Sequence, residues 1–302
     1  MDIYLPIAGQ SVNALFIVAL GFLVGVLSGM FGVGGGFLTT PLLIFYGIPP
    51  PIAVASAATQ ITGASVSGAM VHLRRGGVDL KMGAVMIVGG LAGSVVGAAL
   101  FRLLQTSGQI DVVIGFLYVV ILASIGILML KDALVALGYV REPEQTDQLR
   151  HNRWVASLPL RWRFYSSGLY LSPIAPFTLG FVAGTLTVLL GIGGGFILIP
   201  AMIYLLGMPA RVVIGTSLVM ILAVSAATTM VHSLTTRAVD IVLAALLLVG
   251  GVVGAQYGAI LTTRLKPDLL RLGLAVIILL VALRMLLGLT WRPDEIFSIE
   301  YL

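Results

Sequence analysis

The chain alternates long apolar segments with short polar ones. Within each segment the apolar residues are continuous rather than alternating with polar ones, which favours helices over the strands of a β-barrel. Most segments approach the roughly 20 residues that a helix needs to cross a bilayer. They run over residues 11–29, 37–48, 51–72, 82–101, 110–131, 173–190, 196–207, 211–232, 241–262 and 269–289. This pattern predicts an all-α polytopic membrane protein.

Two glycine-rich stretches interrupt the pattern at matching places. They read FGVGGGF at residues 31–37 and LGIGGGF at residues 190–196, and a proline follows each one. Four glycines in five residues cannot continue a stable helix, because glycine loses the most backbone entropy on ordering. The apolar segments that follow, 37–48 and 196–207, are too short for a full span. We therefore predict that each stretch turns a re-entrant hairpin, and matched interruptions of this kind point to the binding site of a transporter.

The two stretches belong to an internal duplication. The aligned pairs include Gly21 and Gly180, Gly25 and Gly184, Pro41 and Pro200, Gly47 and Gly207, His72 and His232, Gly89 and Gly250, and Gly93 and Gly254. Such spacing indicates two copies of one unit. We divide the chain into a first transmembrane repeat (1–137), a charged cytoplasmic or interfacial linker (138–172) and a second transmembrane repeat (173–302). Each repeat is expected to hold a broken-helix glycine hairpin plus three transmembrane helices.

The basic residues predict how the chain sits in the membrane. Counting each hairpin as two passes gives five segments per repeat, which inverts the second repeat relative to the first. Thirteen of the 17 Lys and Arg residues then share a side with the linker, which places the linker in the cytoplasm and both termini outside. Counting each hairpin as one broken helix makes the repeats parallel and changes the distribution only to twelve against five. Charge does not decide between the two, and the shortness of the second arms favours inverted repeats.

Composition narrows the classes of function. Only 10% of the 302 residues are charged, against about 25% in ordinary soluble proteins. The net charge of +5 is explained by basic loop anchors, so nucleic acid is not an expected partner. The chain has no cysteine, which excludes disulfides and thiolate metal sites. Residues 1–6 also lack the basic start of a cleaved signal peptide. The sequence has no metal cluster, nucleophile–base pair or nucleotide loop, so we expect neither an enzyme nor a cofactor or metal.

The glycine stretches could bind an anion. A new helix is predicted to begin directly after each glycine turn, and the N-terminus of a helix carries roughly half a positive charge and free backbone N–H groups. The alternative is that the glycines only let two helix arms pack closely. The candidate substrate-binding residues of the two hairpins are Gly34, Gly35, Gly36, Phe37, Gly193, Gly194, Gly195 and Phe196.

Polar side chains in the segments after the hairpins could complete such a site. Thr59 and Gln60 lie in the first repeat, and Thr216 and Ser217 lie in the equivalent segment of the second. Hydrogen bonding between helices is the favoured alternative for any single one of them, with Gln60 the exception. No Asp or Glu lies in the middle of a segment, which disfavours cation transport and leaves room for an anion.

His72 and His232 are candidates for proton coupling. They occupy equivalent positions at the ends of their segments, and histidine titrates near neutral pH. The alternative role is an interfacial anchor for a helix end. With inverted repeats the two would lie near opposite faces, so a shared metal site is not expected. The spaced glycines at 89–97 and 250–258 predict close-packing seams that could join the two repeats or two protomers, which leaves a homodimer open.

The whole pattern resembles the sulfite exporter TauE/SafE family of bacterial membrane proteins. The motifs that carry the resemblance are the duplicated G-x-G-G-G-F with its downstream proline, the turns at 47–49 and 207–209, and the glycine tails at 89–97 and 250–258. The resemblance implies a secondary transporter that exports a small sulfur-containing anion, sulfite or an organosulfonate such as sulfoacetate, across the bacterial inner membrane, with proton coupling. An anion channel and a transporter of a small carboxylate are the alternatives. Without a cysteine, thiosulfate handling through a thiol is not expected.

Overall fold

The computed structural model describes residues 2–31, 35–74, 76–137, 159–262 and 267–290. In the first half, two short strands precede five helices: β1 (Asp2–Leu5), β2 (Gln10–Asn13), α1 (Ala14–Phe31), α2 (Gly36–Phe45), α3 (Pro50–Arg74), α4 (Leu80–Thr106) and α5 (Ile110–Ala136). The second half repeats this order: β3 (Trp162–Phe164), β4 (Leu169–Leu171), α7 (Ile174–Leu190), α8 (Gly195–Tyr204), α9 (Ala210–Val231), α10 (Ile241–Thr262) and α11 (Pro267–Thr290). A π-helical turn, His232–Thr236, extends α9.

The described helices have the character of a polytopic membrane protein, as the sequence predicts. Five of them, α4, α5, α9 with its π-turn, α10 and α11, are long and apolar enough to cross a bilayer by length and composition. Shorter apolar helices, α1, α2, α7 and α8, each pack beside one of these five. Large apolar side chains such as Leu15, Val95 and Ile241 are more than two-thirds exposed, which suits contact with lipid rather than water. The two β-hairpins were not predicted.

The first glycine stretch turns the chain back on itself. Gly35 caps α2 with a positive φ of 66°, and a methyl group there would lie 3.3 Å from the side chains of Val24 and Ser28 of α1. At the other end of α2, the ring of Tyr46 stacks on Phe16 at the start of α1, with centroids 4.8 Å apart. A helix of 10 residues spans only about 15 Å, roughly half of a hydrocarbon core. From Gly35 onward, α2 therefore runs back along α1, as the second arm of a re-entrant hairpin must.

The glycine seams join the two halves of the chain in a crossed pattern. The first helix of one half, α1, packs along α10, the fourth helix of the other half, and α7 packs along α4 in the same way. The backbones touch at these seams: a methyl group at Gly25 would lie 2.3 Å from the carbonyl oxygen of Gly251. A methyl group at Gly184 would lie 2.0 Å from the carbonyl oxygen of Gly90. The predicted seams therefore connect the two repeats within one chain.

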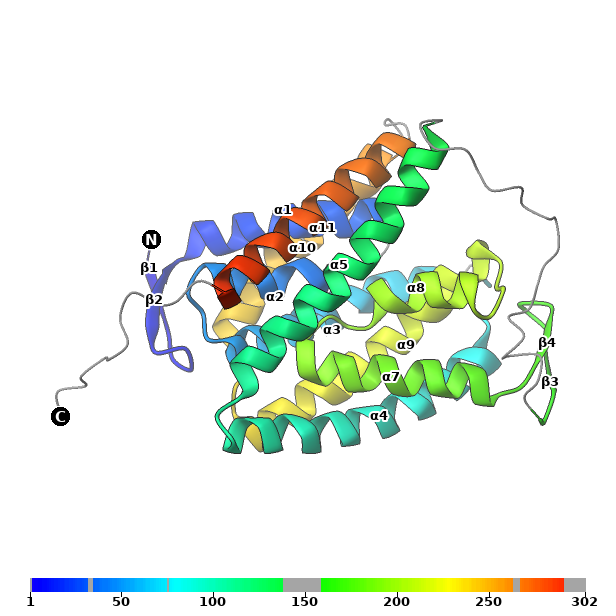
Figure 1. The fold of residues 1–302 in the computed structure, drawn as a ribbon, viewed down its shortest axis with the longest axis horizontal. Coiled ribbons are helices and arrows are strands. Elements are labelled where there is room, and N and C mark those ends of the chain that lie inside the picture. The colour runs from blue at the N-terminus through cyan, green and yellow to red at the C-terminus, as the bar shows by residue number, and fades with distance from the viewer. Residues whose placement is uncertain (1, 32–34, 75, 138–158, 263–266, 291–302) are drawn as a thin grey trace.

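Each β-hairpin is fixed to a buried aspartate of the other half, and the two hairpins lie at opposite ends of the molecule (Figure 1). Asp79 caps α4 by accepting the backbone N–H of Met82 at 3.0 Å. Its second carboxylate oxygen accepts the N–H and the hydroxyl of Ser167, in the turn of the β3–β4 hairpin, at 3.0 and 2.8 Å. The carboxylate therefore ties the start of α4 to the hairpin that precedes α7.

Asp240 plays the equivalent part at the other end. Its carboxylate accepts the N–H of Leu243 in the first turn of α10 and the N–H of Ile7 in the β1–β2 hairpin, both at 3.1 Å. Its own N–H donates to the hydroxyl of Ser56 on α3, at 3.2 Å. Both aspartates are almost completely buried, so the charged hydrogen bonds around them hold the two ends of the crossed arrangement together.

Candidate functional site

The tips of the two glycine hairpins meet inside the molecule. Phe37 and Phe196, the second residues of α2 and α8, stack with their ring centroids 4.3 Å apart and their planes at 2°. Both side chains are buried. In Figure 1, α2 and α8 lie on either side of the middle of the molecule. The two halves therefore bring the N-termini of two short helices together, which the sequence alone could not establish.

Several hairpin glycines are required by this close approach. A methyl group at Gly36 would lie 2.9 Å from the carbonyl oxygen of Gly191 and only 2.0 Å from Cδ1 of Ile61. Gly191 and Gly193 both have φ near +67°, and a methyl group at Gly193 would again press on Ile61, at 2.8 Å. These glycines have the packing role that was the alternative to anion binding. Ile61, which touches both hairpins, was not predicted.

The remaining hairpin candidates divide into two groups. Gly194, with φ +75°, caps α8 as Gly35 caps α2, and Gly195 is the buried first residue of α8. Gly34 lies outside the described residues.

Tyr118, another residue that sequence reasoning did not find, is fully buried on α5, and its hydroxyl donates to the carbonyl of Leu190 directly before the second glycine turn.

The two helix N-termini create a region of positive potential. In α2 the hydrogen bonds begin with Leu38, whose N–H donates to Gly35 at 3.2 Å, and in α8 they begin with Ile197, which donates to Gly194 at 3.0 Å. The N–H groups of the residues before these have no acceptor within their own helix. Neither helix has a side-chain cap or an acidic residue in its first turn. Two such termini placed side by side are suited to an anion.

Gln60 is the candidate polar side chain with unused hydrogen-bonding capacity. It is 5% exposed, and its Nε2 makes a long hydrogen bond of 3.5 Å to the carbonyl of Leu247 on α10. Its Oε1 is buried without a partner among the described residues. An unpaired buried acceptor costs about 1–3 kcal/mol, so such a group calls for an explanation by a ligand, a water or a role in binding. Ile61, the next residue on α3, contacts both hairpins.

The other three polar candidates already bond to the backbone. The hydroxyl of Thr59 donates to the carbonyl of Ala55 at 3.0 Å, and that of Ser217 donates to Ile214 at 3.0 Å. Thr216 is fully buried and accepts the N–H of Asp79 at 3.0 Å, so it supports the start of α4. The structure thus gives each of these hydroxyls a partner within the helices and sets Gln60 apart from them.

The two histidines occupy different environments in spite of their equivalent positions. His72 is half-exposed in the last turn of α3. His232 is fully buried in the π-helical turn, with Nε2 3.0 Å from the carbonyl oxygen of Val188 and Nδ1 3.3 Å from the hydroxyl of Thr236. Its ring meets the ring of Phe101 edge-on, with centroids 4.8 Å apart. His232 therefore contacts α7 shortly before the second glycine turn.

Comparison with known proteins finds relatives over most of the chain. The family model described as "Sulfite exporter TauE/SafE" matches residues 17–285. The chain is 30% identical to "Probable membrane transporter protein YjnA" of Bacillus subtilis over 276 residues, which cover 89% of this chain and 98% of that protein. It is 25% identical to "Probable membrane transporter protein YunE" of the same organism over 281 residues, 90% of this chain and 97% of that protein.

A plant relative matches over a shorter region. "Sulfite exporter TauE/SafE family protein 5" of Arabidopsis thaliana is 41% identical over 58 residues, which cover 19% of this chain and 13% of that protein. No solved structure matches the chain. The family model covers both glycine hairpins and the helices that surround them. The chain is a membrane transporter protein that belongs to the sulfite exporter TauE/SafE family, as its motifs predicted.

Proposed function

We propose that this transporter exports a small sulfur-containing anion, sulfite or an organosulfonate such as sulfoacetate, across the bacterial inner membrane. The observation that carries the proposal is the meeting of the N-termini of α2 and α8, marked by the stacked rings of Phe37 and Phe196. The family description and the printed names of the plant relatives, which refer to sulfite, favour this class of anion.

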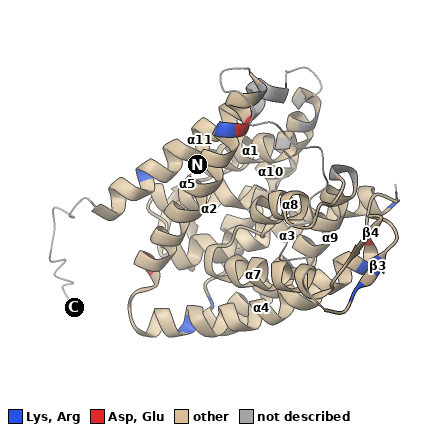
Figure 2. Ribbon diagram, turned by 45° about the vertical axis from the view of Figure 1, so that its right-hand side comes forward, with Lys and Arg blue, Asp and Glu red and all other residues tan. Residues whose placement is uncertain are grey.

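The anion would be held without a charged side chain. No Lys, Arg, Asp or Glu occurs in residues 14–73 or 174–210, which include both hairpins. Figure 2 accordingly shows few charged residues around α3, α7 and α8. Each helix terminus contributes about 0.3–1 kcal/mol when exposed and up to about 2 kcal/mol when partly buried. Binding would therefore be modest in strength, which suits a transporter that must release the anion on the other side.

Gln60 would add both a donor and an acceptor to this site. Its Nε2 has a second N–H beyond the one directed at Leu247, and this N–H can meet an anion oxygen. Its unpartnered Oε1 can only accept, so it is best matched by an anion that still carries a proton. A singly protonated oxyanion would satisfy both atoms. The substrate could in this way carry its own proton, with His232 and His72 as further candidates for proton coupling.

We further propose that the two repeats are inverted in the membrane. Because α1 and α2 form a hairpin, α2 ends at the end of the molecule where α1 begins, and α3 then leads across to the start of α4. Gly180 and Gly184 of α7 face Met86 and Gly90 of α4 in the same order, so α7 is parallel to α4 and begins beside it. This arrangement supports opposite directions for α1 and α7, with the linker in the cytoplasm.

Inversion can be tested on the cysteine-free chain. Ser11→Cys and Tyr165→Cys place single thiols on the two β-hairpins, where both native side chains are exposed. In intact cells an impermeant maleimide should label Ser11→Cys, whereas Tyr165→Cys should react only after the membrane is opened. Labelling of both thiols from the same face would contradict inversion.

Transport itself is tested by flux in proteoliposomes. A secondary transporter should show saturable uptake of labelled sulfite and should exchange external sulfite for internal sulfite. Sulfoacetate and acetate would serve as competitors that separate a sulfonate from a small carboxylate. A steady ionic current without saturation or exchange would instead indicate the alternative function, an anion channel.

A further inference from the structure

We propose that the groove between the first turns of α4 and α7 binds one anionic phospholipid, with an acyl chain in the groove and the phosphate at the basic residues beside it. This site is separate from the glycine hairpins and does not depend on which anion is transported. The groove has a volume of about 400 Å³ and is lined by Ala84, Val85, Val88, Trp162, Pro173, Ile174 and Phe177.

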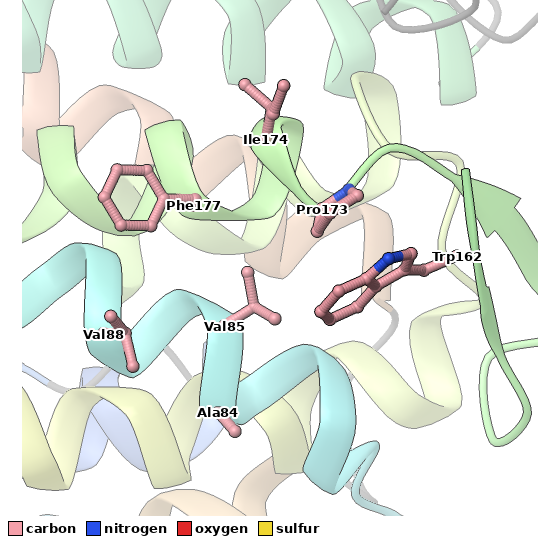
Figure 3. Close-up of a pocket in the computed structure, with 7 residues that line it drawn as sticks. All are labelled: Ala84, Val85, Val88, Trp162, Pro173, Ile174 and Phe177. Atoms are coloured by element: carbon pink, nitrogen blue, oxygen red, sulfur yellow. The ribbon is translucent and has the colours of Figure 1, made fainter. Parts of the chain in front are cut away.

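The groove is built by the glycine seam between the two helices. A methyl group at Gly89 would lie 2.2 Å from the carbonyl oxygen of Phe177, so the backbones of α4 and α7 are in contact at this level. Toward the start of each helix, Ala84 and Val85 of α4 and Pro173 directly before α7 line the space. Figure 3 shows α4 below, α7 above and the indole of Trp162 closing one end of the space.

The lining is suited to hydrocarbon. All seven side chains are apolar or aromatic, and Val88, Phe177 and Trp162 are 60%, 36% and 44% exposed. In a bilayer these surfaces face lipid, because the groove opens on the outside of the helix bundle. Trp162 lies on β3, beside the start of α7, and tryptophan is enriched at the level of the lipid headgroups. The groove therefore extends from the headgroup region toward the hydrocarbon core.

Basic residues gather at the Trp162 end of the groove. The ammonium group of Lys81 lies 5.2 Å from the centroid of the Trp162 ring and donates to the carbonyl of Arg163 at 3.1 Å. Arg161 and Arg163 flank Trp162 on the same hairpin, and both are exposed. Figure 2 shows basic residues around β3 and β4. An ammonium group has three donors, so two N–H groups of Lys81 are left for a phosphate.

Net charge at this end favours an anionic headgroup over a zwitterionic one. The acidic residue beside Lys81 in the chain is Asp79, whose carboxylate is 1% exposed and already accepts hydrogen bonds from Met82 and Ser167. Each basic residue near a membrane surface contributes about fivefold in affinity for anionic lipid. The other half of the molecule lacks the charge: Val242 stands at the position equivalent to Lys81, and the matching registers of the two β-hairpins place Asp2 at the position equivalent to Arg161 and Tyr4 at that of Arg163.

Quenching of Trp162 fluorescence tests the site in the full-length protein. Trp154→Phe and Trp291→Phe leave Trp162 as the single tryptophan. The protein is reconstituted in phosphatidylcholine vesicles that contain either phosphatidylglycerol or phosphatidylcholine with brominated acyl chains. We expect brominated phosphatidylglycerol to quench several-fold more strongly per mole. Lys81→Gln combined with Arg163→Gln should abolish this preference, and Lys81→Arg should retain it.

The other hairpin supplies a matched control. Tyr4, an exposed aromatic residue of β1, is replaced by tryptophan in a background in which the three native tryptophans are phenylalanine. This tryptophan should be quenched equally by both lipids. Equal quenching of Trp162 by the two lipids, no quenching by either, or a preference that survives Lys81→Gln with Arg163→Gln would each overturn the proposal. If Tyr4→Trp were also quenched preferentially by brominated phosphatidylglycerol, the effect would reflect general enrichment of anionic lipid around the protein, and the proposal would again be overturned.

Discussion

Gln60 and Met220 occupy equivalent places in the two halves of the molecule, yet only one of them is polar. The amide nitrogen of Gln60 lies 2.9 Å from where a methyl group on Gly251 would be, and the methyl carbon of Met220 lies 2.9 Å from the same position on Gly90. The residues that follow, Ile61 and Ile221, both approach Gly193. The duplication thus supplies the scaffold twice, while the hydrogen-bonding chemistry is supplied once.

This difference indicates that the fold and the site follow separate constraints. Glycine seams, hairpin turns and helix caps recur in both halves, because the crossed packing of one half on the other requires them on both sides. A ligand-binding amide is needed only where the ligand lies. Residues that differ between equivalent positions, such as Gln60 and Met220, would therefore make the proposed site asymmetric, although its two helix N-termini repeat.

The largest loss of stability is expected when one of the two buried aspartates is replaced. Asp79 accepts three hydrogen bonds and Asp240 accepts two, so Asp79→Ala should cost about 3 kcal/mol of unfolding free energy and Asp240→Ala less. Thermal denaturation of the purified variants in detergent measures the difference. Equal stability of Asp79→Ala and the parent protein would show that the hairpins are not held by these carboxylates.

The second-largest loss of stability is expected at the contact between the two glycine hairpins. Gly36→Ala places a methyl group 2.0 Å from Cδ1 of Ile61 and 2.9 Å from the carbonyl oxygen of Gly191, and overpacking of this kind costs about 1–3 kcal/mol. Transport should fall with it, because the two helix N-termini are forced apart. Gly273→Ala is the matched control, since no other side chain or helix of the described residues lies within 4 Å of its new methyl group. This control should retain full transport and gain slightly in helix stability.

Replacing either histidine should change the free energy of unfolding by a smaller amount, and the two variants should differ. His232→Gln removes a buried ring that bonds to Val188 and packs against Phe101, and we expect a loss of about 1–2 kcal/mol in stability. His72→Gln replaces a half-exposed side chain and should change stability by no more than about 0.5 kcal/mol. Denaturation midpoints of the two variants, recorded side by side, measure this contrast. Equal midpoints would contradict it.

Exchanging the side chains of Gln60 and Met220, the equivalent residues of α3 and α9, should have the smallest effect on stability. Gln60→Met removes a buried oxygen that has no partner among the described residues and should leave stability unchanged or slightly raised. Met220→Gln buries a polar group beside Gly90 and should cost about 1 kcal/mol. Transport should follow the opposite order, with a severe loss in Gln60→Met and little change in Met220→Gln. Similar transport losses in both variants would remove the asymmetry on which the proposed site depends.

Local rules were enough to predict much of the fold. The apolar segments, the glycine interruptions and the duplicated seams each follow from short-range sequence patterns, and the observed helices match them within a few residues. The β-hairpins were missed because strands of three or four residues carry little periodic signal, as in Trp162–Phe164. The 138–158 part of the predicted linker lies outside the described residues.

The candidate site was less accessible to prediction. The stacking joins Phe37 and Phe196, which are more than 150 positions apart in the chain, and it depends on the crossed packing of the two halves, which no local pattern encodes. Thr216 was a candidate because hydroxyls suit oxyanions, and the structure adds that it accepts the N–H of Asp79, whose position in space could not be known from the sequence. Gln60 could be singled out in advance because a lone amide in an apolar helix needs a reason to be there.

The proposed anion site joins the two facing helix N-termini with Gln60. Titration calorimetry with sulfite on the purified protein and on Gln60→Glu tests it most directly, because the substitution keeps the size of the side chain and adds a repelling charge. Met220→Gln, at the equivalent place in the other half, serves as the control. We expect a loss of about ten- to a hundredfold in affinity for Gln60→Glu and an unchanged affinity for Met220→Gln. Unchanged affinity in Gln60→Glu would contradict it and place the anion elsewhere.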